Sequence, residues 1–198
     1  MSDFFDVVRH QRASRVFADT PVTDDEIASV LTAATYAPSA ENRQPWEFVV
    51  VCDPRSRERI GELTKRAWDE GGRAISRQRL SPTLLADVDR GATGGIAAAP
   101  VQIVVCADTQ RGLEATVGSS IFPAVQNLLL AATALGLGSA LTTITTGYRA
   151  ELQTLLDLPA HVWPVAVIPI GRPPRPLGPP RRDPFAAHTH RERYGFGW

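Results

Sequence analysis

The sequence predicts a single domain of the α+β class. Its 198 residues favour one domain and are enough to bury a core. Strand-like apolar runs lie scattered among helical segments without strict alternation, which favours α+β over a doubly wound sheet. After Gly171 the composition shifts to Pro, Gly and Arg. We therefore expect one domain over residues 1–171, with residues 172–198 as an extended tail that belongs to the same domain.

The first half of the chain is predicted to be mainly helical. A capping box at Thr23–Glu26 begins a helix that Pro38 stops near Ala37. The β-rich run after the following loop is too short for a helix and predicts a strand. The predicted elements, in order, are a helix over Asp3–Gln11, the capped helix, a strand over Trp46–Cys52, a charged helix over Arg55–Glu70 broken by Gly71–Gly72, and a polar, partly helical stretch over Arg73–Ala99.

The second half is predicted to contain two more strands around one long apolar helix. Ser119 or Ser120 can cap this helix, and Gly136 or Gly138 can end it. Because leucines cover most of its faces, we expect it to be buried all round, with a second copy of the chain as part of its cover. The other elements are a strand over Val101–Ala107, a turn near Thr109–Gly112, a β-favouring stretch over Ser139–Thr145, a short helix over Tyr148–Leu156 and a strand over Val162–Ile170.

Composition argues against several functional classes. Lys plus Arg and Asp plus Glu both number 21, so net charge gives no reason to expect nucleic acid or an anionic membrane as a partner. Two cysteines, Cys52 and Cys106, and four histidines without ligand spacing favour no disulfide framework and no metal site. The amino terminus lacks a secretory pattern, and polar and glycine residues interrupt the apolar run Ile121–Leu141, so we expect a cytoplasmic protein without a membrane span.

Two glycine-rich stretches resemble fragments of a dinucleotide-binding fingerprint. They are Gly91–Gly95 and Gly136–Gly138. Neither follows a strand and opens a helix with the required third glycine, so we do not expect a Rossmann site.

Three features remain as candidates for a binding site. Arg12, Ser14 and Arg15 place two guanidinium groups and a hydroxyl where they can meet a phosphate and a ring carbonyl, although a solvated basic turn has the same composition. Ser39, Asn42 and Gln44 offer short polar groups from a loop stiffened by prolines, which suits a flat heterocycle; a plain helix-to-strand connection is the alternative.

The third feature is the tail. Its prolines forbid a regular helix or central strand, so it is expected to run extended over a surface. A disordered linker or a proline-rich ligand for another domain is the alternative. Such a free tail would not need the apolar anchors near its end, which are Phe185, Tyr194, Phe196 and Trp198.

These features, in this order and with the long helix between them, resemble the nitroreductase family of FMN enzymes. The likeness covers nearly the whole chain and is strongest over residues 37–51, APSAENRQPWEFVVV. Supporting likenesses are AVQNLLLAATALGLGSA at 124–140, IPIGRP at 168–173, and the tail with RRDPF and HRERYG. The resemblance implies a nitroreductase-like fold, with a central, mostly antiparallel sheet flanked by helices, in an intertwined homodimer.

The resemblance also assigns FMN contacts to individual positions. Arg12 and Arg15 would reach the phosphate, ribityl chain and pyrimidine end, and Arg182, with Arg181 beside it, would clamp the phosphate. The loop would come from the partner subunit, and residues 141–143 would place their backbone beside the reactive nitrogen of the ring. The full set is Arg12, Ala13, Ser14, Arg15, Pro38, Ser39, Ala40, Asn42, Gln44, Leu141, Thr142, Thr143, Arg181 and Arg182.

The sequence departs from the family pattern at three places. Ala13 stands where many relatives have serine, Thr142–Thr143 lacks the acidic residue that some relatives have, and the stretch from Arg73 to Gly95, which forms an excursion over the site in relatives, is short. Because of these departures, the sequence does not identify the acceptor substrate.

The implied activity is hydride transfer from NADH or NADPH through FMN to a nitroaromatic, quinone or similar acceptor, by a ping-pong mechanism without a catalytic side chain. Reduced flavin is anionic at its pyrimidine end, so an arginine there favours the reduced state. The alternatives are flavin fragmentation, dehalogenation or dehydrogenation on the same fold, a flavin- or deazaflavin-binding dimer without turnover, and a structural dimer without cofactor.

Overall fold

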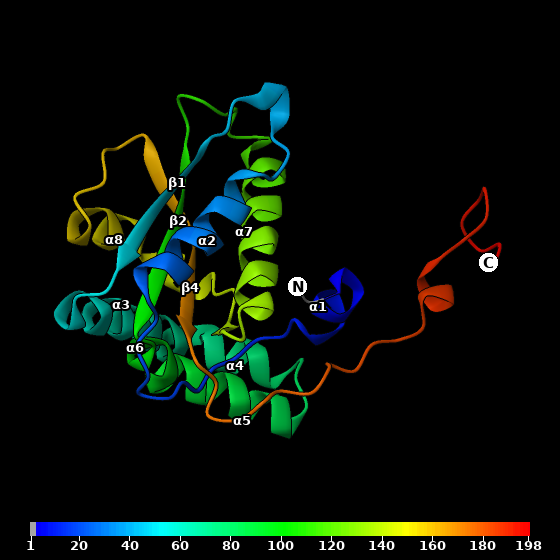
Figure 1. Cartoon of the computed structure of the whole chain (residues 1–198), viewed down its shortest axis with the longest axis horizontal. Coiled ribbons are helices and arrows are strands. Elements are labelled where there is room, and N and C mark those ends of the chain that lie inside the picture. Colours follow the sequence, from blue (N-terminus) through cyan, green and yellow to red (C-terminus); the bar gives the residue numbers. More distant parts are fainter. Residues whose placement is uncertain (1–2) are drawn as a thin grey trace.

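A four-stranded sheet forms the centre of the computed structural model, which describes residues 3–198 (Figure 1). The strand order is β1-β2-β4-β3, and every pair of neighbours is antiparallel. The strands are β1 (Trp46–Val51), β2 (Val101–Asp108), β3 (Gly138–Ser139) and β4 (Val162–Gly171). The predicted α+β class with an antiparallel sheet is confirmed.

Helices cover both faces of this sheet. Alternate residues of β2 point to opposite faces, as the two-residue period of a strand requires. Ile103 and Val105 pack toward α2 (Asp24–Thr35) and α7 (Val117–Ala134). Val104 and Cys106 pack toward α3 (Pro54–Ala67) and α8 (Arg149–Leu155). The result is three layers with one apolar core on each side of the sheet.

Cys106 shows that water is excluded from the core between the sheet and α3. Its side chain is fully buried, and burial raises the pKa of its thiol to about 12, with a further contribution from the carboxylate of Glu47. Cys52 lies exposed just after β1, and both thiols are free in the described chain.

The predicted capping box is present at the start of α2. The backbone N–H of Glu26 donates to Thr23 Oγ1 at 3.2 Å, and the backbone N–H of Thr23 donates to Glu26 Oε2 at 2.9 Å. The second of these bonds, together with a 2.6 Å contact from Arg172, lowers the pKa of the Glu26 carboxyl. Glu26 therefore ties α2 to the first residue after β4.

One predicted helix boundary is wrong. Neither Ser119 nor Ser120 caps α7, which begins at Val117 after Thr116; both serines lie inside its first turns. The predicted break at Gly71–Gly72 is confirmed: the π turn over Trp68–Gly72 that follows α3 is kinked at the non-helical Gly71 before α4 (Arg73–Arg77) begins. The predicted end of α7 is correct: Gly136 follows its last residues with φ +73°, a conformation that favours glycine.

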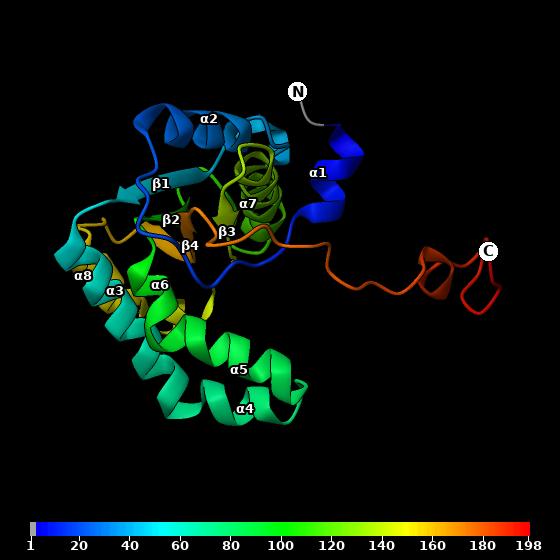
Figure 2. The ribbon, with the colours of Figure 1, turned by 60° about the horizontal axis from the view of Figure 1, so that its bottom comes forward.

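The partly helical stretch over 73–99 forms a helical excursion beside the sheet. It consists of α4, α5 (Pro82–Arg90), a second π turn over Gly91–Gly95 and α6 (Ile96–Ala98). Figure 2 shows α4 and α5 side by side below the layers, where they form a pair of packed helices.

The long helix α7 is buried on only one side within a single chain. Ile121, Leu128 and Leu129 lie in the core, but Phe122 is 42% exposed and Leu135 is 39% exposed. The expectation of burial all round is therefore not met by one chain. By length and composition alone α7 could cross a membrane, yet it packs against α2 and the sheet as a core helix does.

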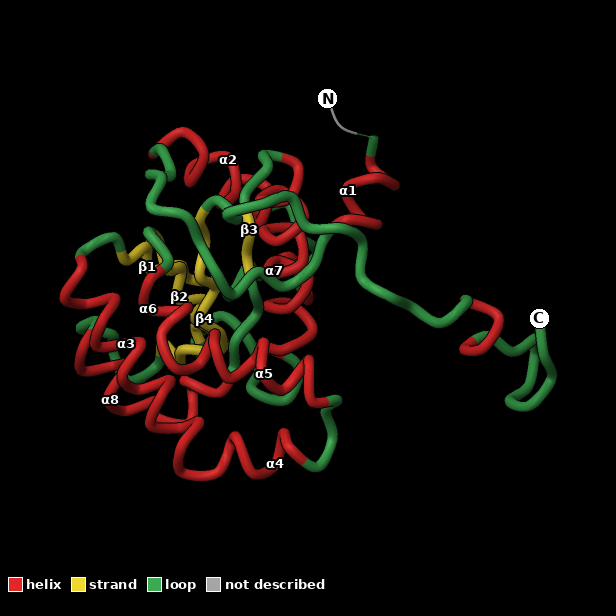
Figure 3. Tube along the Cα trace, turned by 90° about the horizontal axis from the view of Figure 1, so that it is seen from below, coloured by secondary structure: helices red, strands yellow, loops and turns green. Residues whose placement is uncertain are grey.

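After β4 the chain leaves the layers as an extended tail, in the manner expected from its prolines (Figures 1 and 3). Its first residues run beside the segment that follows α1 (Phe4–His10): the backbone N–H of Ala18 donates to the carbonyl of Arg172 at 2.8 Å. Further along, Phe185, Tyr194, Phe196 and Trp198 are each at least 64% exposed. Within one chain these four aromatic side chains do not pack into the hydrophobic core of the described residues.

Candidate functional site

Residues 12–15, which we call the arginine segment, lie against the edge of the sheet at β3. The backbone N–H of Ser14 donates to the carbonyl of Ser139 at 2.8 Å, and Ala13 forms a parallel bridge with Ser139. A Cβ on Gly138 would come within 2.7 Å of the Ser14 side chain, so a glycine is needed for this approach. The arginine segment therefore has a fixed position next to residues 138–143.

Four predicted site residues line one cavity of about 200 Å³ at this place. Arg15 enters from the arginine segment, and Leu141, Thr142 and Thr143 enter from the stretch after β3. Ile144, next to Thr143, also lines the cavity, and the remaining wall comes from the helical excursion and the turn before it, through Trp68, Ser76, Val88, Gly91, Ala92 and Ile96. We call this space the Arg15 cavity.

The guanidinium of Arg15 forms an ion pair with a carboxylate of the helical excursion. Arg15 Nη1 lies 2.7 Å from Asp87 Oδ2 on α5, and the two side chains are 22% and 39% exposed. The stem of Arg15 passes close to the second π turn: a Cβ on Gly91 would lie 2.7 Å from Arg15 Cδ, and one on Gly95 would lie 2.0 Å from the Arg15 carbonyl oxygen. The glycines of this turn thus make room for the arginine segment.

Two polar contacts hold other parts of the cavity wall. Trp68 is 2% exposed, and its Nε1–H donates to Asp89 Oδ1 at 2.9 Å. The hydroxyls of Thr64 and Thr145, both fully buried, lie 2.7 Å apart and join α3 to the end of the 141–145 stretch. Thr142 is fixed by backbone bonds to Val167 in both directions.

Arg12 points to a different space from Arg15. Its Nη1 donates to the carbonyl of Gly178 in the tail at 3.0 Å. With His10 and Arg172 it lines a second cavity of about 370 Å³ between the end of α7 and the start of the tail. The two arginines of the segment therefore line separate cavities.

The predicted polar loop over 38–44 is ordered by its own contacts. Ser39 Oγ accepts from the backbone N–H of Gln44 at 3.0 Å, and Gln44 Nε2 donates to Asn42 Oδ1 at 3.3 Å. Glu41, Asn42 and Gln44 have φ of 53°, 54° and 50°, a left-handed conformation that side chains adopt at a cost. Such strain in an exposed loop favours a functional role over a plain connection.

This loop and the arginine segment lie at opposite ends of α7. The backbone N–H of Ala40 donates to Ser120 Oγ in the first turns of α7, whereas Ser14 bonds to Ser139 just after the last turn. From Ser120 to Ala134, its last residue, α7 rises about 21 Å at about 1.5 Å per residue. Pro38, Ser39, Ala40, Asn42 and Gln44 therefore cannot share a cavity with Arg15 in the same chain.

The tail arginines are also remote from the Arg15 cavity within one chain. Arg181 and Arg182 are exposed, and the side chain of Arg182 donates only to the carbonyl of Arg181 among residues 3–198. The structure thus unites four of the fourteen predicted residues around one cavity, adds Ala13 and Ser14 beside it, and leaves the loop, Arg12 and the tail arginines elsewhere.

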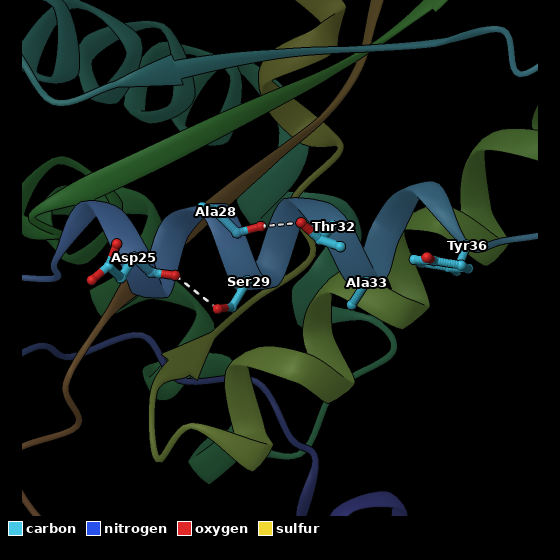
Figure 4. Close-up of a pocket in the computed structure, with 6 residues that line it drawn as sticks. All are labelled: Asp25, Ala28, Ser29, Thr32, Ala33 and Tyr36. Carbon is cyan, nitrogen blue, oxygen red and sulfur yellow. Dashed lines mark hydrogen bonds between the residues drawn. The ribbon is translucent and has the colours of Figure 1, made fainter.

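A third hollow lies on the outer face of α2 (Figure 4). It is a shallow open pocket with a volume of about 630 Å³. Small residues line its middle, with Asp25 at one end and Tyr36 at the other. The hydroxyls of Ser29 and Thr32 donate to carbonyls of their own helix, at 2.8 and 2.7 Å. None of the predicted site residues lines this surface.

The family resemblance indicated that residues 73–95 lie over the site, but it named none of the side chains through which this region lines the cavity. Trp68 lies in the turn between α3 and α4, and Ser76 and Val88 line the cavity from α4 and α5. The glycine-rich stretch 91–95, which does not fit a dinucleotide motif, is a local signal of this wall. Its glycines mark close backbone approach to Arg15.

The chain is similar to known proteins over nearly its full length. The family model described as "Nitroreductase family" matches residues 8–172. A Methanothermobacter thermautotrophicus protein, provisionally named NADH dehydrogenase/NAD(P)H nitroreductase, is 32% identical over 188 residues, covering 92% of this chain and 83% of the relative. An NAD(P)H FMN reductase of Bacillus subtilis is 25% identical, with 98% of this chain and 75% of the relative covered.

Two further likenesses bear on fold and chemistry. The crystal structure of a nitroreductase-like protein from Desulfovibrio desulfuricans, in complex with FMN, has a TM-score of 0.74 at 26% identity and covers 98% of this chain and 99% of that chain. The rat iodotyrosine deiodinase 1 is 28% identical over 185 residues, which cover 87% of this chain and 63% of the relative.

Proposed function

The chain belongs to the nitroreductase family, and we propose that it is a homodimeric, FMN-dependent oxidoreductase that uses NADH or NADPH to reduce a nitroaromatic, quinone or similar small acceptor. The observation that carries the proposal is the Arg15 cavity. Arg15, Leu141, Thr142 and Thr143 were assigned to the flavin from the sequence pattern, and they line one space.

The donors around this cavity fit an anionic, carbonyl-rich group. Arg15 brings a guanidinium, and the backbone N–H of Thr143 donates to no other residue within 3–198. Ser139 Oγ, beside the arginine segment, is buried without a hydrogen-bond partner in the described chain. Unsatisfied buried polar groups are costly, so such groups are expected to meet a ligand or an ordered water.

When bound, FMN supplies the redox chemistry by taking a hydride from the nicotinamide and passing electrons to the acceptor in turn. The chain itself binds and orients. Arg15 provides positive charge, the fixed 141–143 stretch provides backbone groups, and Trp68, Val88 and Ile96 keep the cavity apolar. This division of labour requires no proton-transfer side chain.

The separation of the predicted pieces supports a homodimer. In one chain the loop over 38–44 contacts α7 at Ser120, whereas the arginine segment lies beyond the last residue of α7, about 21 Å further along the helix axis by the helical rise. A twofold partner can bring its own loop to the Arg15 cavity, and it can cover the exposed side of α7 that carries Phe122. In the same arrangement the tail, with Arg181 and Arg182, would wrap the partner and reach an FMN phosphate, as part of one domain.

The proposed activity is tested on the purified protein reconstituted with FMN. We expect a yellow protein whose flavin absorbance is bleached by NADH or NADPH without oxygen and restored by a nitroaromatic or a quinone. A stable yellow colour that neither nicotinamide bleaches would indicate a flavin-binding dimer without this turnover. A protein that FMN neither colours nor stabilises against heat would contradict the proposal.

A second reaction is reductive dehalogenation, which the likeness to iodotyrosine deiodinase favours. It uses the same cofactor site, so the same preparation decides between the two. If a halogenated tyrosine reoxidises the reduced flavin faster than nitroaromatics and quinones do, and halide is released, the acceptor is a halogenated tyrosine and our assignment is wrong.

A further inference from the structure

We propose that Asp87 is a positioning residue that sets the reduction potential of the bound flavin. It would do so by holding the guanidinium of Arg15 at the cavity wall and offsetting its positive charge. This inference rests on the proposed function, because it concerns the same cavity, and it assigns a role to a residue of the helical excursion.

The geometry leaves Arg15 little freedom. Its backbone is fixed by the bond of the neighbouring Ser14 to Ser139 and by the close approach of Gly95 to its carbonyl, and its stem lies against Gly91. The guanidinium then ends 2.7 Å from Asp87 Oδ2, with 22% of the Arg15 side chain exposed. Asp87 therefore determines where the positive charge of Arg15 sits.

The charges around the cavity are few. Arg15 is the one charged residue among those that line it, and Asp87 is its one ion-pair partner in the chain from residue 3 to 198. Asp89, two residues further on α5, is occupied by Trp68 Nε1 and by Arg73 Nη2 at 3.0 Å. The one cation that lines the cavity is thus paired with one carboxylate just outside the lining, which offsets its charge.

An arginine that is paired with a carboxylate raises the reduction potential of a nearby flavin less than an unpaired arginine does. Reduction adds negative charge to the flavin, and a nearby cation stabilises that charge most where water is excluded. The carboxylate of Asp87 opposes this effect and keeps the bound flavin a stronger reductant. Removing the carboxylate charge while keeping the hydrogen bond should therefore make the potential more positive.

The experiment compares midpoint potentials of FMN-loaded wild type and Asp87→Asn by spectroelectrochemical titration. The asparagine amide oxygen can still accept from Arg15, so the change is mainly one of charge. We expect a shift to more positive potential that corresponds to a several-fold to tenfold greater preference for the reduced cofactor. Tenfold equals about 30 mV for a two-electron couple. Reduction of the flavin by the nicotinamide should become faster relative to reoxidation of the flavin by the acceptor.

Asp89→Asn is the matched control, because it removes the same charge from the same helix but leaves Arg15 paired. We expect it to shift the potential much less. An unchanged potential in Asp87→Asn, or equal shifts in both variants, would overturn the inference while the proposed function stands. Failure of the wild type to bind FMN would instead refute the proposed function itself.

Discussion

Gly95→Ala is expected to destabilise the protein by about 3 kcal/mol, at the upper end of the usual cost of overpacking. The added Cβ would lie 2.0 Å from the carbonyl oxygen of Arg15, which is backbone and cannot rotate away. Either the second π turn or the arginine segment must then move. Because the arginine segment also forms the Arg15 cavity, FMN retention should fall together with the midpoint of urea unfolding.

Gly147→Ala is the control for this prediction, because a Cβ there meets nothing within 4 Å. It should change stability by less than about 0.5 kcal/mol, as most surface substitutions do. Both variants are compared with the wild type at equal protein concentration, since the stability of a dimer depends on it. Wild-type unfolding and flavin retention in Gly95→Ala would show that the turn and the arginine segment do not pack as described.

Phe122→Glu is expected to convert the protein to a monomer that retains little FMN. Phe122 is 42% exposed on the side of α7 that faces neither α2 nor the sheet. If a twofold partner covers this side, the substitution buries an unpaired carboxylate in each subunit, and each such charge costs several kcal/mol. The measurement is the mass in solution by light scattering, together with the flavin content.

The control for this surface is Leu84→Glu on α5, where the side chain is 44% exposed. That variant should stay dimeric and yellow. A Phe122→Glu protein that remains a flavin-loaded dimer would place the interface on another face, and the role of α7 in the assembly would have to be abandoned.

Local signals in the sequence were sufficient for most of the elements. The capping box of α2 and the glycine after α7 are made by neighbouring residues, and the observed contacts agree with them. The strands follow from short β-rich runs bounded by turn residues. The start of α7 was missed because its first residue follows a threonine that makes no side-chain cap, so the two serines inside the helix looked like better candidates.

The cavity could be predicted only in part. Arg15 and residues 141–143 belong to stretches with a family pattern, and they were found from the sequence. Asp87 and Trp68 depend on how the helical excursion folds back, which is set by contacts between distant residues. Gly71–Gly72 indicated the break that the structure has at Gly71, but no local pattern shows that Trp68, just before this break, is buried and lines the cavity.

The central claim is that each flavin site combines the arginine segment of one chain with the loop of its partner. The most direct test is a heterodimer, purified through two different tags, of one Arg15→Ala chain and one Asn42→Ala chain. If the site is shared across the interface, one site carries both substitutions and the other carries neither. We predict near-empty homodimers of each variant and one tightly held FMN per heterodimer. A heterodimer as empty as the two homodimers would contradict the account, because it would mean that both residues serve the site of their own chain.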